Sequence, residues 1–178
     1  MEKHSDMSTR AWHHEVFKVL HETDIRQVAY VPDAGFDGLL RKCLADPDLS
    51  CTMLTTEEEG VALVAGAWLG GDRAVLMMQS SGVGNCLNML TLIKTCCFPL
   101  LSIVTMRGEW KEFNPWQEPM GRNTQAALEL SGATVFRVNE SQHAAETVAE
   151  AAELAFGDSR SAAVLISQSV IGEKKWQK

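Results

Sequence analysis

Three consecutive glutamates, Glu57 to Glu59, are side chains whose type and position could support acid–base or hydrogen-bonding chemistry. They lie between an apolar run that ends at Leu54 and a helix-like stretch of small residues that begins at Gly60. Part of the group has a structural explanation, because Thr56 and Glu59 have the spacing of a capping box and carboxylates stabilise helix N-termini. Capping does not require three acids, so a functional carboxylate and a purely structural one both remain open.

A second group is the segment Gln79–Asn85 (QSSGVGN), which follows another apolar run. Its glycines, Gly82 and Gly84, let the backbone turn tightly and come close to a ligand. The segment lacks the third glycine of a dinucleotide-binding fingerprint and the Gly-Lys-Ser/Thr of a phosphate-binding loop. A plain turn between a strand and a helix is therefore the alternative to a binding site.

A further acid, Asp33, comes shortly after a β-branched run that ends at Val31. Aspartate is also common at the start of a helix, so this position has a structural explanation as well. In a parallel sheet, the turns that hold Asp33, Glu57 and Gln79–Asn85 would open on the same edge. That convergence favours one shared site over three unrelated turns.

The elements that would position these groups alternate between short apolar runs and stretches of about 10–15 residues with helical spacing. Continuous apolar strands are typical of a parallel sheet that is covered on both faces. We therefore expect an α/β fold, with a doubly wound, mostly parallel six-stranded sheet and helices on both faces. The predicted strands are 27–31, 49–54, 74–78, 99–106, 135–138 and 162–167, and the predicted helices are 12–22, 36–44, 60–69, 84–95 and 143–156.

A long connection without a predicted element runs from Arg107 to Arg122 and contains two prolines and two tryptophans. It follows a buried strand, at the edge where open α/β sheets bind ligands. Arg107, Lys111 and Arg122 are its cations, and a guanidinium can bind an anion through two hydrogen bonds. Arg107 is the first candidate for that role, with a solvated loop arginine as the alternative.

Length and composition limit the classes of protein to which the chain can belong. Its 178 residues predict a single domain over 1–178, with flexible ends at about 1–10 and 170–178. The 16 Lys and Arg against 23 Asp and Glu give a net charge of −7, so we expect no nucleic acid partner. No apolar stretch approaches the ~20 residues of a membrane helix, and the polar start is unlike a secretory signal.

The cysteines and histidines carry no predicted chemistry. Five cysteines without a C-x-x-C pair indicate reduced, mostly buried thiols in a cytoplasmic protein. All five histidines are expected on the surface: His4, His13, His14, His21 and His143.

Together, these motifs resemble the pyrimidine-binding domain of thiamine-diphosphate-dependent decarboxylases. The resemblance rests on Glu57 ahead of a small-residue helix that reaches Gly66, and on the segment SGVGN at 81–85. The segments VPD (31–33), MQSSGVGN (78–85) and MRGEW (106–110) are similar to the branch that acts on phosphonopyruvate and sulfopyruvate. GEWKEFNPWQEPMG (108–121) also favours that branch, and the likeness extends over about 11–167.

The resemblance implies a role for each motif. Glu57 would hydrogen-bond N1′ of the aminopyrimidine ring and so activate thiamine diphosphate, with Glu58 as the alternative if the alignment is off by one. Asp33 would lie near the reacting 2-keto acid and aid proton transfer, and Arg107 would bind the anionic tail of the substrate. The residues beside the cofactor would be Gln79, Ser81, Gly82, Gly84 and Asn85.

The resemblance also implies a partner. The family holds the diphosphate through Mg2+ on a Gly-Asp-Gly motif followed by an Asn, and Gly157-Asp-Ser159 lacks the second glycine. We therefore expect no metal ligand in this chain, and a separate beta subunit that carries the diphosphate-binding domain and Mg2+. Thiamine diphosphate would be shared between the two chains of a hetero-oligomer.

The reaction implied by the resemblance is the conversion of 3-sulfopyruvate to sulfoacetaldehyde and CO2. In the family this step serves coenzyme M biosynthesis or sulfonate breakdown. Two alternatives remain open: a phosphonopyruvate decarboxylase subunit, and a non-catalytic protein that keeps the fold of the pyrimidine-binding domain.

Overall fold

The structure, a computed structural model, describes residues 3–173 and the side chains from Trp12 onward. A sheet of six strands forms its centre, in the order β2-β1-β3-β4-β6-β5, and every neighbouring pair is parallel. This confirms the predicted α/β fold, with a sheet that is parallel throughout. The strands are β1 (Ile25–Tyr30), β2 (Ser50–Met53), β3 (Arg73–Gln79), β4 (Leu100–Thr105), β5 (Thr134–Val138) and β6 (Ser161–Ile166).

The sheet separates two hydrophobic cores, because successive side chains of a strand point to opposite faces. In β4, Leu101 and Ile103 belong to one core, whereas Leu100 and Val104 belong to the other. Every residue of this central strand is buried. Since both faces are covered, the strand is a continuous apolar run in the sequence rather than an alternating one.

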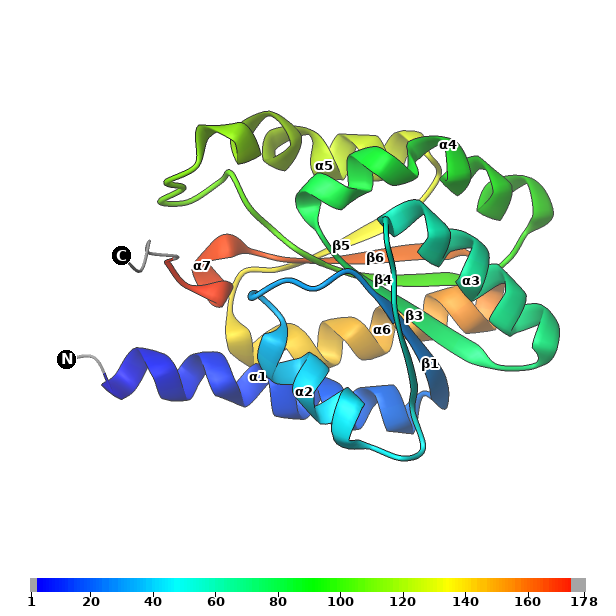
Figure 1. Cartoon of the computed structure of the whole chain (residues 1–178), viewed down its shortest axis with the longest axis horizontal. Coiled ribbons are helices and arrows are strands. Elements are labelled where there is room, and N and C mark those ends of the chain that lie inside the picture. The colour runs from blue at the N-terminus through cyan, green and yellow to red at the C-terminus, as the bar shows by residue number, and fades with distance from the viewer. Residues whose placement is uncertain (1–2, 174–178) are drawn as a thin grey trace.

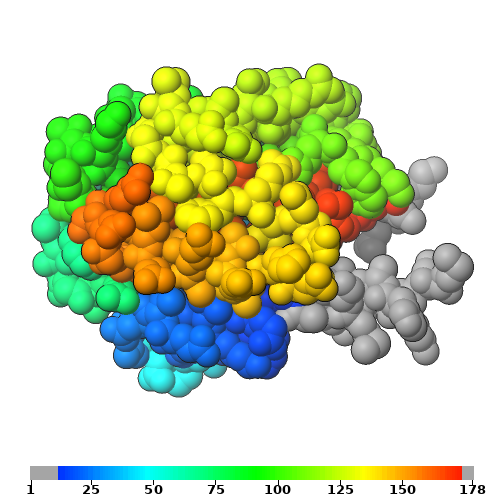
Figure 2. All heavy atoms as spheres, turned by 180° about the vertical axis from the view of Figure 1, so that it is seen from behind, coloured from blue at the N-terminus to red at the C-terminus, as the bar shows by residue number. Residues whose placement is uncertain are grey.

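Helices cover both faces of the sheet (Figure 1). One core contains residues of α1 (Lys3–Glu22), α2 (Asp37–Ala45) and α6 (Ala144–Asp158). The other contains residues of α3 (Glu57–Gly70), α4 (Ser80–Cys96) and α5 (Glu118–Leu130). Figure 2, which shows the molecule from behind, has α6 lying along α1 on the outer side of the layer formed by α1, α2 and α6. Short helical segments are η1 (Pro115–Gln117), η2 (Ser141–His143) and α7 (Gln168–Ile171).

The sequence prediction missed α5, where it placed the end of a long loop. The helix begins at Glu118, with Pro119 in its first turn. Proline is tolerated there because the first N–H groups of a helix have no intrahelical partner. Gly121, Thr124 and Leu128 are its buried residues, and Met120 and Ala127 pack partly buried against the same core. Small or polar residues make up most of this inner face, so the sequence offered few large apolar residues from which to predict a helix.

The predicted flexible ends fall partly outside the described residues, namely at 1–2 and 174–178. Residues 3–10 form part of α1, and Val170 and Ile171 belong to α7. Within 3–173, no helix is long and apolar enough to cross a membrane. All five cysteines are free thiols, but only Cys43 and Cys86 are fully buried, so the expectation of mostly buried thiols is wrong.

The chain changes direction between β1 and β3. From β1 it moves outward to β2 through α2 on one face, and from β3 it moves to β4 through α4 on the other face. The connections leaving the carboxyl ends of β1 and β3 therefore diverge, which is where open α/β sheets bind ligands. Asp33 follows β1 and Gln79 ends β3, so these two predicted site residues lie at this position.

Candidate active site

Asp33 lies in the turn after β1 and accepts hydrogen bonds on both carboxylate oxygens. Gln79 Nε2, at the end of β3, donates to Oδ1 at 2.8 Å. Thr105 Oγ1, at the end of β4, and the backbone N–H of Gly35 donate to Oδ2, each at 2.8 Å. Hydrogen bonds to an ionised carboxylate are stronger than those between neutral groups. The carboxyl ends of three neighbouring strands thus meet on the Asp33 side chain.

Gly35 makes this close meeting possible. A Cβ atom at Gly35 would lie 2.6 Å from Oδ2 of Asp33 and 3.0 Å from Cβ and Cγ2 of Thr105. Thr105 itself is completely buried. Sequence reasoning missed both residues, although the position of Thr105 at the end of a predicted strand was an available signal.

Glu57 is the first residue of α3 and is only 8% exposed. Its Oε2 accepts a hydrogen bond from Asn85 Nδ2 of α4 at 2.8 Å. A Cβ atom at Gly82 would lie 2.3–2.4 Å from Cγ, Cδ and Oε1 of Glu57, so glycine is what leaves room for this side chain. Glu58 and Glu59 are exposed. The structure therefore distinguishes Glu57 as the carboxylate that faces inward.

The predicted capping box forms only in part. The N-cap residue, Thr56, makes no side-chain hydrogen bond to the helix. The carboxylate of Glu59 accepts a hydrogen bond from the N–H of Thr55 at 3.0 Å, one residue earlier than in a standard box. Capping accounts for Glu59 and does not account for the burial of Glu57.

The thiol of Cys86 responds to the negative charge at the start of α3. Burial, and then the charges of Glu57 and Glu58, raise the pKa of Cys86 to about 12. Its sulfur lies 4.0 Å from Sδ of Met78, in a fully buried position. A thiol with this pKa stays protonated near neutral pH, so Cys86 is a packing residue rather than a nucleophile.

The segment Gln79–Asn85 connects the Asp33 group with the Glu57 group. Its first residue donates to Asp33 and its last residue donates to Glu57. Between them, Ser81 Oγ donates to the side-chain oxygen of the first residue at 2.9 Å. Gly84 faces α5 instead, because a Cβ atom there would lie 3.2 Å from the sulfur of a methionine in that helix.

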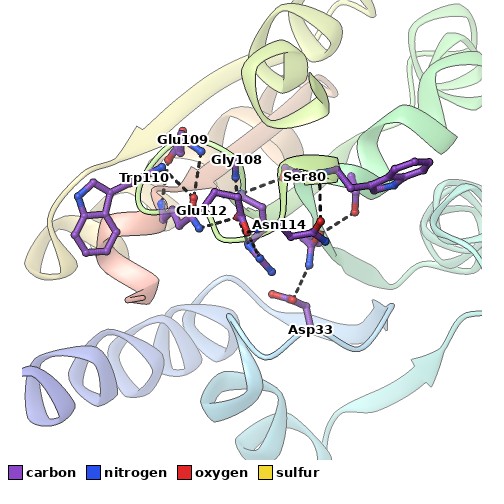
Figure 3. A network of polar contacts seen from close by, with 12 residues as sticks. Asp33, Ser80, Gly108, Glu109, Trp110, Glu112 and Asn114 are labelled. Carbon is purple, nitrogen blue, oxygen red and sulfur yellow. Dashed lines mark hydrogen bonds and ion pairs between the residues drawn. The ribbon is translucent and has the colours of Figure 1, made fainter. Parts of the chain in front are cut away.

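Arg107 is 5% exposed, so the alternative of a solvated loop arginine is wrong. Its Nε and Nη2 donate to the carboxylate of Glu112 at 2.7 and 2.5 Å, within the network of Figure 3. Its backbone N–H donates to Ser80 Oγ at 3.1 Å, which ties the loop to the start of α4. A substrate anion would have to use the Nη1 side of the guanidinium or replace Glu112.

Glu112 is the centre of this network (Figure 3). Besides Arg107, its carboxylate accepts hydrogen bonds from the N–H groups of Gly108 and Asn114, at 3.1 and 3.0 Å, and from Gln168 Nε2 at 2.9 Å. Burial alone would raise the pKa of Glu112, but these hydrogen bonds, led by that from Arg107, lower it to about 2. The loop after β4 is therefore folded around an ionised, buried ion pair.

The other two loop cations are exposed and also paired. Lys111 Nζ lies 3.9 Å from the carboxylate of Glu173. Arg122 Nη2 lies 2.8 Å from the carboxylate of Glu118, one turn away in α5. Each cation that the sequence offered for an anionic ligand thus has an acidic partner within the chain.

His13 contradicts the expectation that every histidine lies on the surface. It is 7% exposed, and its Nε2 lies 3.4 Å from the carbonyl oxygen of Gly35 in the Asp33 turn. Burial lowers the pKa of His13 below its ordinary value. The side chain lies on the inner face of α1 next to Trp12, with the two ring centroids 4.0 Å apart and the ring planes tilted by 46°. The side chain of His4 lies outside the described side chains.

The site thus offers a buried hydrogen-bond acceptor in Glu57 and a carboxylate fixed by several donors in Asp33. Within the described side chains, no group of three or more His, Cys, Asp or Glu could hold a metal ion. The arrangement is suited to binding a polar organic group at Glu57 and to exchanging a proton near Asp33.

No model of a known protein family matches the chain, but several known proteins are similar to it. Sulfopyruvate decarboxylase subunit alpha of Methanococcus maripaludis is 33% identical over 152 residues, which cover 85% of this chain and 91% of that protein. Sulfopyruvate decarboxylase of Methanosarcina acetivorans is 33% identical over 129 residues, which cover 72% of this chain and 33% of that protein.

Among solved structures, 2-oxoglutarate:ferredoxin oxidoreductase from Magnetococcus marinus matches with a TM-score of 0.70 over 90% of this chain and 29% of that chain. At 13% identity, this likeness concerns the fold alone. The Methanococcus subunit, by contrast, shares a third of the aligned residues over nearly its whole length. On that ground the chain belongs to the family of sulfopyruvate decarboxylase alpha subunits.

Proposed function

We propose that this chain is the alpha subunit of a thiamine-diphosphate-dependent decarboxylase that converts 3-sulfopyruvate to sulfoacetaldehyde and CO2. The observation that carries the proposal is the buried carboxylate of Glu57, held by Asn85 in a space that Gly82 leaves open. A protein that kept only the fold would have no use for an inward carboxylate at this edge. The family membership adds the reaction and the substrate.

The residues of this edge fit the pyrimidine ring of the cofactor. Glu57 is an acceptor placed away from water, so it would hold a ring N–H by a charge-assisted hydrogen bond. Asn85 donates to its other side and would keep the carboxylate oriented. When bound, thiamine diphosphate supplies a thiazolium ring that accepts the electron pair released as CO2 departs.

The other residues of the site would handle the substrate and its proton. Decarboxylation breaks the bond between the carboxylate and the keto carbon, and one proton takes the place of CO2. We assign the transfer of that proton to Asp33, because its carboxylate lies where the connections after β1 and β3 diverge. Arg107 stays a prediction as the ligand of the sulfonate, through the Nη1 side that Glu112 leaves uncovered.

A partner subunit would complete the enzyme. The name "subunit alpha" of the Methanococcus relative implies an assembly of at least two kinds of chain. In the Methanosarcina protein, the match to this chain covers 33% of the length, which leaves room for another domain in the same polypeptide. We infer that a beta subunit carries the corresponding domain here, binds the diphosphate through Mg2+, and shares the cofactor with this chain.

The test is a decarboxylase assay of this chain mixed with its beta subunit, thiamine diphosphate and Mg2+. We expect release of CO2 from 3-sulfopyruvate at a higher kcat/KM than from phosphonopyruvate. Glu57→Gln should lower kcat at least ~10²-fold, since it removes an ionised acceptor from the reaction. Its unfolding midpoint in urea should stay close to that of the unchanged chain, because the amide keeps the size of the side chain.

Glu58→Gln is the matched control, because it makes the same replacement of a carboxylate by an amide at the exposed neighbouring residue. It should keep nearly full turnover. Loss of activity in Glu58→Gln with normal activity in Glu57→Gln would transfer the role to Glu58. No decarboxylation of 3-sulfopyruvate by the mixed subunits would refute the proposed reaction, and exclusive use of phosphonopyruvate would replace the substrate.

A further inference from the structure

We propose that Gln79 and Thr105 are positioning residues for Asp33, which hold its carboxylate ionised and in one orientation at the divergence of the β1 and β3 connections. The inference rests on the proposed function in so far as Asp33 takes part in proton transfer. It gives Gln79 a task other than lying beside the cofactor, and it adds Thr105 to the site.

The amide of Gln79 has one orientation that satisfies its neighbours. Its Oε1 accepts the proton of Ser81 Oγ at 2.9 Å, and its Nε2 donates to Asp33 Oδ1 at 2.8 Å. With the amide turned over, a side-chain oxygen would face the carboxylate oxygen of Asp33 and both would be acceptors. Ser81 therefore acts on Asp33 through Gln79, by keeping the NH2 group directed at the carboxylate.

Thr105 supplies the donor for the other carboxylate oxygen. Its hydroxyl lies 2.8 Å from Asp33 Oδ2 and 3.4 Å from the carbonyl oxygen of Met78. A hydroxyl has one proton, and the shorter contact to a charged acceptor is the stronger one. Since Thr105 is completely buried at the end of the central strand β4, it cannot turn its hydroxyl to water instead.

The two side chains act on opposite oxygens of one carboxylate. Gln79 binds Oδ1 and Thr105 binds Oδ2, where the N–H of Gly35 adds a further donor. Because each is a donor, the arrangement stabilises the charged form of Asp33 over the protonated form. Asp33 is thereby kept ionised in the resting site, and its rotation is opposed from two sides.

The first experiment is a 13C NMR titration of the Asp33 carboxyl group in the full chain, which needs no activity. Thr105→Val keeps the shape of the side chain and removes the donor, so we expect the pKa of Asp33 to rise by about one pH unit. Gln79→Glu puts a second carboxylate against Asp33, so the pair should retain a proton to still higher pH. If one of the two variants does not fold, the titration of Asp33 in the other tests the inference by itself.

Thr124→Val is the matched control, because Thr124 is another completely buried threonine. Its hydroxyl donates to the backbone oxygen of Met120 at 2.7 Å, lies 3.4 Å from that of Ser80, and does not donate to a carboxylate. The titration of Asp33 should be unchanged in this variant. An unchanged titration of Asp33 in both Thr105→Val and Gln79→Glu would overturn the inference.

The second experiment is the pH profile of kcat/KM for the assembled enzyme with 3-sulfopyruvate. In Thr105→Val, the acidic limb of the profile should move to higher pH by as much as the pKa of Asp33 rises in the NMR titration. In Thr124→Val, the limb should not move. A moved titration with an unmoved profile would refute the role of these residues in the reaction. A moved titration with no decarboxylation by the unchanged enzyme would refute the proposed function and leave the positioning of the carboxylate established.

Discussion

Two glycines of the candidate site are explained by the side chains for which they leave room. Gly82 lies where any Cβ would overlap Glu57, and Gly35 lies where it would overlap Asp33 and Thr105. Neither glycine has a left-handed backbone conformation. Their purpose is therefore close approach between segments, and not a turn that other residues cannot adopt.

A substitution at Gly82 tests this explanation. Gly82→Ala would place a Cβ 2.3 Å from Cδ of Glu57, so the carboxylate must move and its bond to Asn85 is lost. We expect kcat of the assembled enzyme to fall at least tenfold, with a loss of about 1–3 kcal/mol in the free energy of unfolding. Steady-state kinetics and urea unfolding measure the two effects.

Gly66→Ala is the control for the change from glycine to alanine inside a helix. Apart from its chain neighbours and the backbone of its own helix, no described atom would lie within 4 Å of a Cβ at Gly66. Its better helix propensity should stabilise the chain by up to about 1 kcal/mol without changing kcat. Full turnover in Gly82→Ala would mean that the observed position of Glu57 is not required.

At the level of elements, the loop after β4 is held by an internal ion pair and by α7. Gln168, at the start of α7, accepts hydrogen bonds from the N–H groups of Glu109 and Trp110, each at 3.1 Å, and donates to Glu112. Gly121 in α5 packs against the backbone of Arg107. The loop is thus part of the folded core of this edge rather than a freely moving connection.

The ion pair predicts a pH-dependent stability. The pKa of Glu112 is lowered from the ordinary value of 4.5 to about 2, so its ionised form stabilises the folded chain above pH 4.5. That contribution is lost progressively as the pH falls from 4.5 towards 2. Glu112→Gln should cost about 3 kcal/mol at pH 7, because it leaves a buried guanidinium without its counter-charge.

Urea unfolding of both proteins between pH 7 and pH 3 measures this contribution. The difference between the unchanged chain and Glu112→Gln should shrink below pH 4.5. Glu118→Gln, which breaks the exposed pair with Arg122, should cost no more than about 0.5 kcal/mol. A constant difference over this pH range would show that Glu112 does not titrate with folding.

At the level of the whole molecule, one continuous sheet lies between the two hydrophobic cores and contributes side chains to both. Leu100 and Leu101 are neighbours in β4, and they are buried in opposite cores. Because the central strand contributes to both, loss of packing on either face weakens the same sheet. We expect the described chain to unfold as one cooperative unit, in line with the single domain that the sequence predicts.

Leu100→Ala and Leu101→Ala test this expectation from the two sides. Each should lower the free energy of unfolding by about 2–5 kcal/mol, with coincident transitions by circular dichroism and tryptophan fluorescence. Leu130→Ala, at an 85% exposed position, should change the stability by no more than about 0.5 kcal/mol. Separate transitions of the two probes in either core variant would divide the chain into independent units.

The sequence alone predicted the six strands, the helices on both faces and the edge at which the acids gather. These features depend on local patterns, because the burial of a continuous apolar run and the turn that follows it are both visible within about a dozen residues. The family resemblance also selected Glu57 ahead of Glu58. The helix α5 was missed because small or polar residues, Gly121, Thr124 and Ala127, make up most of its inner face.

Only the tertiary structure decided which partner each polar group has. Gln79 and Thr105 reach Asp33 from 46 and 72 residues away, after the parallel register has aligned the ends of three strands. Arg107 is bound by Glu112, although the sequence offered it only as the ligand of an anionic substrate or as a solvated loop arginine. A residue type states what a side chain can donate or accept, whereas burial and the packing of distant segments decide which atom it meets.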